Sequence, residues 1–110
     1  MDLLGSALDA SEKNHRVVSQ NIANVNTPGY KTKRLEFERL LSQLQSSDAK
    51  DASNDPLPVK QLEGLAERVD GNNVNLEQEV AELKENALAF QAFSHLLASR
   101  VSTMRRAISG

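Results

Sequence analysis

The chain has 110 residues, a formal net charge of −2 at pH 7, no cysteine, no tryptophan and only 4% aromatic residues. Such a chain forms one domain at most, and this composition predicts too small a core for a self-sufficient globule. There is no basic excess to suggest nucleic-acid binding. The lack of cysteine excludes disulfides and thiolate metal sites. We expect no transmembrane segment, because the sequence has no apolar run long enough to span a membrane. We expect no cleaved signal peptide, because the start of the chain has no basic region followed by an apolar one.

The first predicted element is a helix from about Leu3 to Asn24, about 33 Å long at 1.5 Å per residue. Apolar and small residues recur along it at alternating spacings of four and three, which is heptad spacing. The positions in this pattern are Leu4, Leu8, Ser11, His15, Val18, Ile22 and Val25. A stripe this narrow predicts a helix that packs against a partner helix rather than standing alone.

A dense run of turn-forming residues ends this helix. The residues are Asn21, Ile22, Ala23, Asn24, Val25, Asn26, Thr27, Pro28, Gly29 and Tyr30. Asparagine competes for backbone hydrogen bonds and therefore weakens the end of a helix. Pro28 and Gly29 suit the two central positions of a type II turn, which needs a positive φ at the second. The chain should leave the helix and reverse direction here.

The middle of the chain predicts less regular structure. Residues 35–44 carry apolar side chains on one face of a short helix. Residues 45–59 are rich in Ser, Asp and Asn and predict a flexible linker. Asp70-Gly71 is a turn signal, with a small hairpin possible between Val69 and Val74.

The last predicted helix runs from about Asn75, an N-cap candidate, to about Ile108 and is about 50 Å long. Its heptad pattern continues to the end of the chain. The positions in the pattern are Leu76, Val80, Leu83, Ala87, Phe90, Ser94, Leu97, Val101, Met104 and Ile108. Acidic side chains crowd its first turns and arginines its last, as the helix dipole favours. We interpret Glu77, Glu79, Glu82 and Glu85 as a solvated acidic face.

Together these elements predict an all-α fold in which the two long terminal helices pair as an antiparallel coiled coil. The shorter helix cannot cover the longer stripe, so at least a third of that stripe needs another partner. Attraction between Asp2, Asp9 and Glu12 and the arginines at 100, 105 and 106 would bring the termini together. The uncovered part would then lie near Leu76 to Ala87, where Lys31, Lys33, Arg34 and Phe37 could cover it.

No residue pattern in the sequence indicates catalysis, metal binding or cofactor binding. His15 and His95 lack a carboxylate or cysteine cluster, so we interpret them as partly buried or interface residues rather than metal ligands. Ser11 and Ser94 are better explained by close helix approach than as nucleophiles. We therefore expect no catalytic, cofactor or metal site, no small-molecule substrate and no nucleic-acid partner.

The long first helix, the Asn-rich run of residues 21–30, the polar middle and the heptad last helix resemble bacterial flagellar rod proteins. The segment Asp70-Gly71-Asn72-Asn73-Val74 and the short length resemble a proximal rod member of that group. The resemblance implies three parts within one domain: residues 1–44 with the motif, 45–74 as a linker and 75–110 as the heptad helix. Tyr30 would anchor the motif against a helix of the same or the next subunit.

The resemblance also implies a structural subunit of the proximal rod, a helical drive shaft that transmits torque. Its partners would be itself, other rod subunits, and proteins at the junction with the membrane ring and export gate. It would lie on the periplasmic side of the basal body, exported by the flagellar type III apparatus. Two alternatives remain: another rod protein, or a cytoplasmic helical-hairpin adaptor or export chaperone, which would stay inside the cell.

Overall fold

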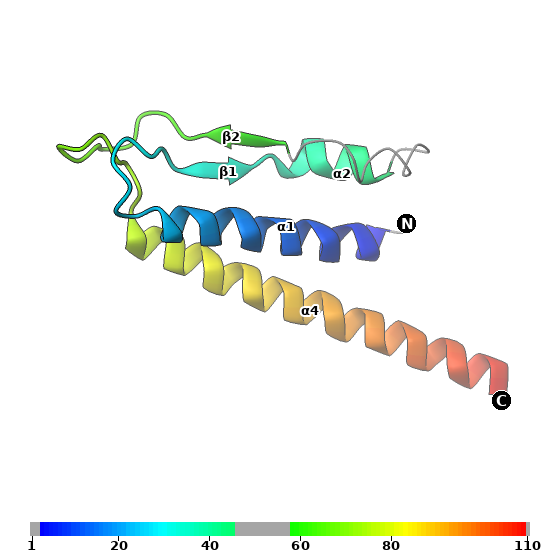
Figure 1. Ribbon diagram of the computed structural model, residues 1–110. Coiled ribbons are helices and arrows are strands. Elements are labelled where there is room, and N and C mark those ends of the chain that lie inside the picture. The colour runs from blue at the N-terminus through cyan, green and yellow to red at the C-terminus, as the bar shows by residue number, and fades with distance from the viewer. Residues whose placement is uncertain (1–2, 46–57, 110) are drawn as a thin grey trace.

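The computed structural model describes residues 3–45 and 58–109, which form an elongated molecule of 65 × 29 × 19 Å. Its elements in chain order are α1 (Leu3–Ala23), β1 (Lys33–Leu35), α2 (Phe37–Gln45), β2 (Val59–Gln61) and α4 (Leu76–Ser109). Figure 1 shows α1 lying between two layers, with α4 on one side and the two strands with α2 on the other. No helix in these described ranges combines the length and apolar character needed to cross a membrane.

The three predicted helices are confirmed, with ends within one or two residues of the expected positions. Asn75 caps α4, because its side-chain Oδ1 accepts a hydrogen bond of 3.2 Å from the backbone N–H of Gln78. The predicted antiparallel pairing of the two long helices is also confirmed, since α4 starts beside the end of α1 and runs back along it (Figure 1).

A small two-stranded sheet adds to the predicted, mainly helical fold. β1 pairs antiparallel with β2, with Lys33 opposite Gln61 and Leu35 opposite Val59. Each strand has three residues, too few for an alternating pattern to be recognised in the sequence. The buried side of Leu35 joins the apolar cluster between α1 and this layer, whose other members are Ala10, Val17, Leu40 and the partly buried Val59. The linker predicted at 45–59 lies largely outside the described residues.

The hairpin suggested around Asp70-Gly71 has its turn but not its two strands. The turn itself forms, and Gly71 has a φ of +84°. However, neither Val69 nor Val74 lies in a strand. The backbone of this segment instead pairs with the Asn-rich motif, which a local sequence pattern does not reveal.

The contact face of α4 differs from the predicted stripe by one position. Its most buried residues are Glu79 and Asn86, whereas Val80 is half-buried and Ala87 is exposed. The spacing of seven is as predicted, but its central members are polar. Asn86 donates a hydrogen bond of 2.7 Å to the carbonyl of Ser11. Hydrogen bonds of this kind stabilise a polar contact face, which a hydrophobicity pattern does not reveal.

The uncovered part of the last helix lies at its C-terminal end, not near Leu76 to Ala87 as predicted. The two helices are aligned where α1 ends and α4 begins, and α4 has 34 residues against 21 in α1. The excess, about 20 Å at 1.5 Å per residue, therefore projects past the start of α1 (Figure 1). We call residues 94–109 the bare end of α4.

Ion pairs between the acidic start of the first helix and the arginines of the last were also predicted. They do not set this alignment. Asp9 pairs with Lys13 at 2.7 Å, and Glu12 pairs with Arg16 at 2.7 Å, both within α1. Asp2 lies outside the described residues. Exposed pairs one helical turn apart contribute little to stability, so the alignment must be fixed elsewhere.

Candidate functional site

The Asn-rich motif forms the predicted turn. The backbone N–H of Tyr30 donates to the carbonyl of Thr27 at 3.2 Å, and Gly29 has the positive φ, +76°, that a type II turn requires at this position. Asn24 helps to close the helix, because its side-chain amide donates to the carbonyl of Gln20 at 2.8 Å and its oxygen accepts from the hydroxyl of Thr27 at 3.0 Å. The motif is thus an ordered exit from α1.

A second segment, residues 68–74, docks onto this turn. The N–H of Gly29 donates to the carbonyl of Asp70 at 2.9 Å, and the side-chain amide of Asn72 donates to the carbonyls of Asn24 and Thr27 at 2.9 and 2.7 Å. Asn72 is fully buried. A side chain added at Gly71 would lie 3.5 Å from the Cα of Gly29, so the two backbones approach closely. This docking holds the end of α1 beside the start of α4.

Asn73 and Thr32 continue the same junction toward β1. The Oδ1 of Asn73 accepts hydrogen bonds from the backbone N–H of Thr32 at 2.6 Å and from its hydroxyl at 2.9 Å. The N–H of Asn73 donates to the carbonyl of Tyr30 at 3.2 Å. Both Thr32 and Asn73 are buried, so these bonds satisfy polar groups that would otherwise be costly to bury.

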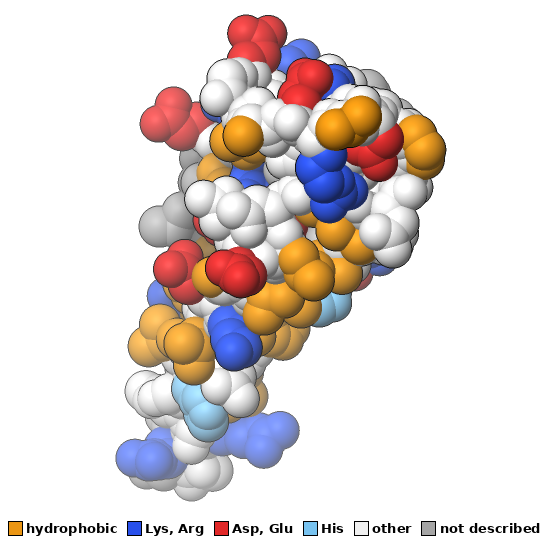
Figure 2. All heavy atoms as spheres, turned by 90° about the vertical axis from the view of Figure 1, so that its left-hand side faces the viewer, with side chains coloured by type: hydrophobic (Ala, Val, Ile, Leu, Met, Phe, Trp, Pro, Cys, Tyr) orange, Lys and Arg blue, Asp and Glu red, His pale blue; other side chains and the backbone are white. Residues whose placement is uncertain are grey.

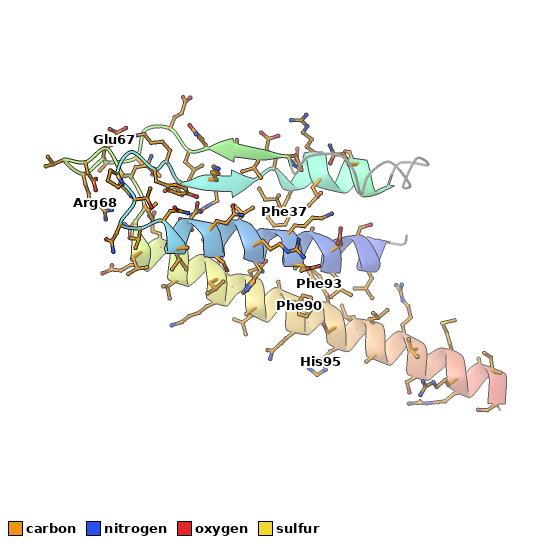
Figure 3. All side chains as sticks on the ribbon, in the orientation of Figure 1. Phe37, Glu67, Arg68, Phe90, Phe93 and His95 are labelled. Atoms are coloured by element: carbon orange, nitrogen blue, oxygen red, sulfur yellow. The ribbon has the colours of Figure 1, made fainter. Side chains whose placement is uncertain are left out.

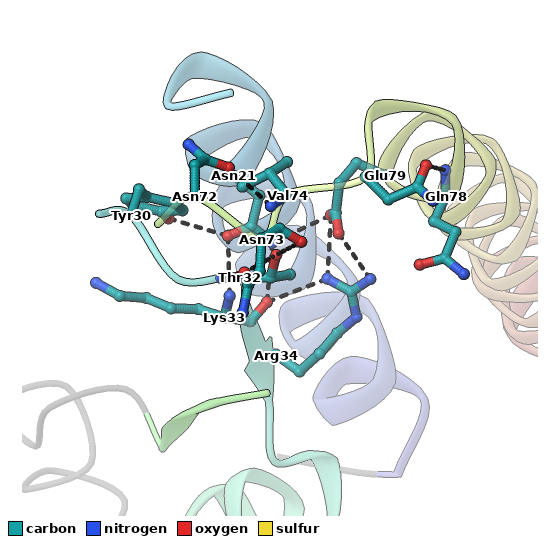
Figure 4. A network of polar contacts seen from close by, with 11 residues as sticks. Asn21, Tyr30, Thr32, Lys33, Arg34, Asn72, Asn73, Val74, Gln78 and Glu79 are labelled. Carbon is teal, nitrogen blue, oxygen red and sulfur yellow. Dashed lines mark hydrogen bonds and ion pairs between the residues drawn. The ribbon is translucent and has the colours of Figure 1, made fainter. Parts of the chain in front are cut away.

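Asn21 is the centre of the network, and we call it the hub (Figure 4). Its Oδ1 accepts from the N–H of Lys33 at 3.0 Å and from the hydroxyl of Tyr30 at 2.9 Å. Its amide donates to the carbonyl of Lys33 at 2.8 Å and to Oε2 of Glu79 at 3.1 Å. This fully buried side chain therefore joins α1 to β1, to the turn and to α4 at once.

A buried ion pair completes the hub. Arg34 reaches Glu79 through both terminal nitrogens, at 3.0 Å to Oε2 and 2.8 Å to Oε1. Glu79 is 1% exposed, which corrects the prediction of a solvated face at this position. Of the basic residues predicted to cover this part of the last helix, Arg34 does so. Lys31 instead binds Glu67 at 2.7 Å, and the ammonium of Lys33 lies 5.8 Å from the centre of the Tyr30 ring.

Tyr30 anchors the motif within its own chain, and its environment predicts sensitivity to alkali. Burial raises the pKa of the Tyr30 phenol above 10.0, and the negative charge of Glu79 raises it further. A raised folded-state pKa means stability that is complete below about pH 10 and is lost as pH rises through that pKa. Urea unfolding at pH 8 and pH 11 should show a larger alkaline loss for the natural chain than for Tyr30→Phe. Equal losses in both would contradict a buried phenol.

About half of the motif is exposed. Ile22, Asn24, Val25 and Tyr30 are partly buried, and the exposed members are Ala23, Asn26, Thr27, Pro28 and Gly29. Sequence reasoning identified the segment, but it did not distinguish the buried hub from these exposed positions. The only local signal was that Asn21 falls inside the helix, where a polar residue of low helix propensity needs a reason.

The residues predicted for packing divide along the molecule. Val18 is buried, and Leu4, Leu8, Ile22, Val80 and Leu83 are half-buried. The exposed members are Leu76, Phe90, Leu97, Val101, Met104 and Ile108. Phe90, a member of the predicted heptad pattern, is 43% exposed, while Phe93, one turn later, is half-buried (Figure 3). The exposed apolar positions of the bare end therefore form a continuous unpaired stripe.

His15 is exposed at a groove between α1 and α4 that Ser11, Glu12, Ala87 and Phe90 also line. His95 is exposed on α4 (Figure 3). Within residues 3–45 and 58–109, no group of three or more His, Cys, Asp or Glu side chains is arranged to hold a metal ion.

A pair of long antiparallel helices, locked at one end by a polar hub and bare along the other, defines an elongated helical subunit shaped to pack against others. A family described as flagella basal body rod protein matches residues 1–31, which span α1 and the Asn-rich motif. The match therefore covers α1 together with Asn21, the centre of the hub.

Relatives that align over most of the chain belong to the same group of rod proteins. The FlgB rod protein of Bacillus subtilis is 27% identical over 97% of this chain and 91% of its own length. Those of Aquifex aeolicus and Cereibacter sphaeroides are each 30% identical, over 89% and 94% of this chain and 83% and 89% of theirs. The chain belongs to the FlgB family of flagellar basal body rod proteins. It is a structural subunit of the rod, not an adaptor or chaperone.

Proposed function

We propose that the chain forms part of the proximal rod and transmits torque by helix packing alone, without catalysis. The observation that carries this is the bare end of α4, where Leu97 is 39%, Val101 41% and Ile108 84% exposed. Fully burying an exposed side chain of this size stabilises by about 1.5–3 kcal/mol, and covering the part of each that is still exposed contributes a share of that. A neighbouring subunit supplies the cover that α1 is too short to give.

The two ends of the molecule differ, which favours a polar, repeating assembly. One end carries the docked motif, and the other carries a single projecting helix (Figure 1). Contacts between unlike surfaces produce rings or open helical filaments rather than closed pairs. A helical shaft of such subunits would resist twisting through side chains packed along its length.

The proposed partners follow from the same arrangement. They are other rod subunits and, at the base of the shaft, the proteins that join it to the membrane ring and export gate. The proposed location is the periplasmic side of the basal body, reached through the flagellar type III apparatus. Another rod protein such as FlgC is not favoured, because the relatives aligned over most of this chain are FlgB proteins.

Deletion in a flagellated cell that encodes the chain tests this function. We expect cells without filaments, and isolated basal bodies that stop before the rod is complete in electron micrographs. Re-expression of the natural chain should restore both. Complete rods in the deletion strain would contradict the proposal, as would recovery of the chain only from the cytoplasmic fraction.

A further inference from the structure

The bare end of α4 is both apolar and basic. Its exposed apolar side chains are Leu96, Leu97, Val101, Met104 and Ile108. Residues 94–109 also contain three arginines and no aspartate or glutamate. Two bare ends placed side by side would therefore set like charges against each other, which opposes pairing of this surface with itself. A partner surface that matches the bare end would carry apolar and acidic side chains.

The opposite end of the molecule carries an acidic excess. Residues 62–77 contain four acidic side chains, Glu63, Glu67, Asp70 and Glu77, and one basic side chain, Arg68. Glu67 pairs with Lys31 at 2.7 Å and Asp70 lies 3.8 Å from Arg68, so Glu63 and Glu77 are the two without an ion pair to a described residue. We call this segment the acidic end. Figure 3 places Glu67 and Arg68 at the end of the molecule farthest from the C-terminus. In Figure 2, acidic and basic side chains are interspersed over this near end, and the receding end of α4 shows basic ones.

An apolar residue marks the tip of the acidic end. Val69 is fully exposed, although it lies between Arg68 and Asp70 in a segment held firmly to the motif. Arg68 donates to the carbonyl of Val25, and the N–H of Gly71 donates to the carbonyl of Arg68 at 2.8 Å. The hydrogen bonds on either side of Val69 therefore hold its exposed side chain in a fixed position, where a second molecule can reach it.

We propose that the bare end of α4 docks on the acidic end of a second copy of this chain. The inference rests on the proposed rod function and specifies which surfaces meet. The two surfaces lie at opposite ends of a molecule 65 Å long, so one copy cannot bring its own together. Each copy offers one surface of each kind, and the contact therefore propagates from copy to copy.

Cysteine cross-linking tests this contact, because the natural chain has no cysteine. Val69→Cys and Ile108→Cys are introduced together into a strain lacking the natural chain, and isolated basal bodies are oxidised. We expect covalent multimers of the chain, with neither single variant giving them. The matched control pairs Val69→Cys with Leu88→Cys, a residue 67% exposed in the middle of α4, and should give none.

Charge reversal adds a second measurement. Adding Arg105→Glu and Arg106→Glu to the cysteine pair should abolish the multimers, and Glu63→Arg with Glu77→Arg should restore them. Dimers from Ile108→Cys alone, multimers from the Leu88 control, or a cross-link only to a different rod protein would overturn the contact with a second copy. Swimming and rod length under reducing conditions report the rod function separately, so complete rods without this cross-link would reject only this inference.

Discussion

Replacing Glu79 with alanine should destabilise the folded chain by about 3–5 kcal/mol, because it leaves the guanidinium of Arg34 without its buried partner. Arg34 is 19% exposed and Glu79 1% exposed, so water cannot fully replace the lost contact. The same change removes an acceptor from the amide of Asn21. Against a total stability of about 5–15 kcal/mol for a domain, this is a large loss.

Urea unfolding followed by circular dichroism measures the effect, and Glu77→Ala is the matched control. Glu77 lies two positions earlier on the same helix but is exposed, so its loss should change stability by less than about 0.5 kcal/mol. Replacing both partners, with Glu79→Leu and Arg34→Met, should recover much of the loss, because no uncompensated charge remains buried. Equal effects at positions 77 and 79 would argue against the hub.

Replacing Leu97 and Val101 together with aspartate should abolish swimming while leaving the isolated subunit folded. Both side chains are about two-fifths exposed on the bare end, so the monomer loses little by the change. An assembled rod would have to bury two carboxylates against apolar neighbours, at several kcal/mol each unless they are paired. Basal bodies should stop at an incomplete rod.

Ser99→Asp with Thr103→Asp provides the control for this pair. These positions have the same spacing and gain the same charge, but lie on the opposite face of α4 from Leu97 and Val101. We expect this variant to swim. Motility counts in soft agar and electron micrographs of basal bodies distinguish the two. If both variants swam normally, the stripe of the bare end would not be an assembly surface.

The helices were predictable because their signals are local. The helical periodicity, the Asn75 cap and the Pro28-Gly29 turn are each read from nearby residues. The helices, the cap and the turn formed as expected, although the contact face of α4 is shifted by one position. The paired long helices followed from their matching periods. The family resemblance rested on residues 21–30 and 70–74, and the relatives confirm it.

The hub and the alignment of the helices were not predictable, because they depend on distant partners. The partner of Asn21 on α4 is 58 positions away, and the partner of Arg34 there is 45 positions away. In a hydrophobicity pattern, Glu79 looks like any other glutamate in an acidic first turn. The strands have the same difficulty, since each has three residues and its partner lies beyond the linker.

The docking of residues 68–74 onto the motif has a consequence for any process that delivers the chain from its N-terminus onward, such as synthesis on a ribosome. Until residue 79 arrives, the amide of Asn21 lacks its carboxylate acceptor, and α1 lacks the long helix that packs along it. About seven-tenths of the polypeptide must therefore emerge before the hub can close. The junction between the two long helices forms last, after β1, α2 and β2 have already been delivered.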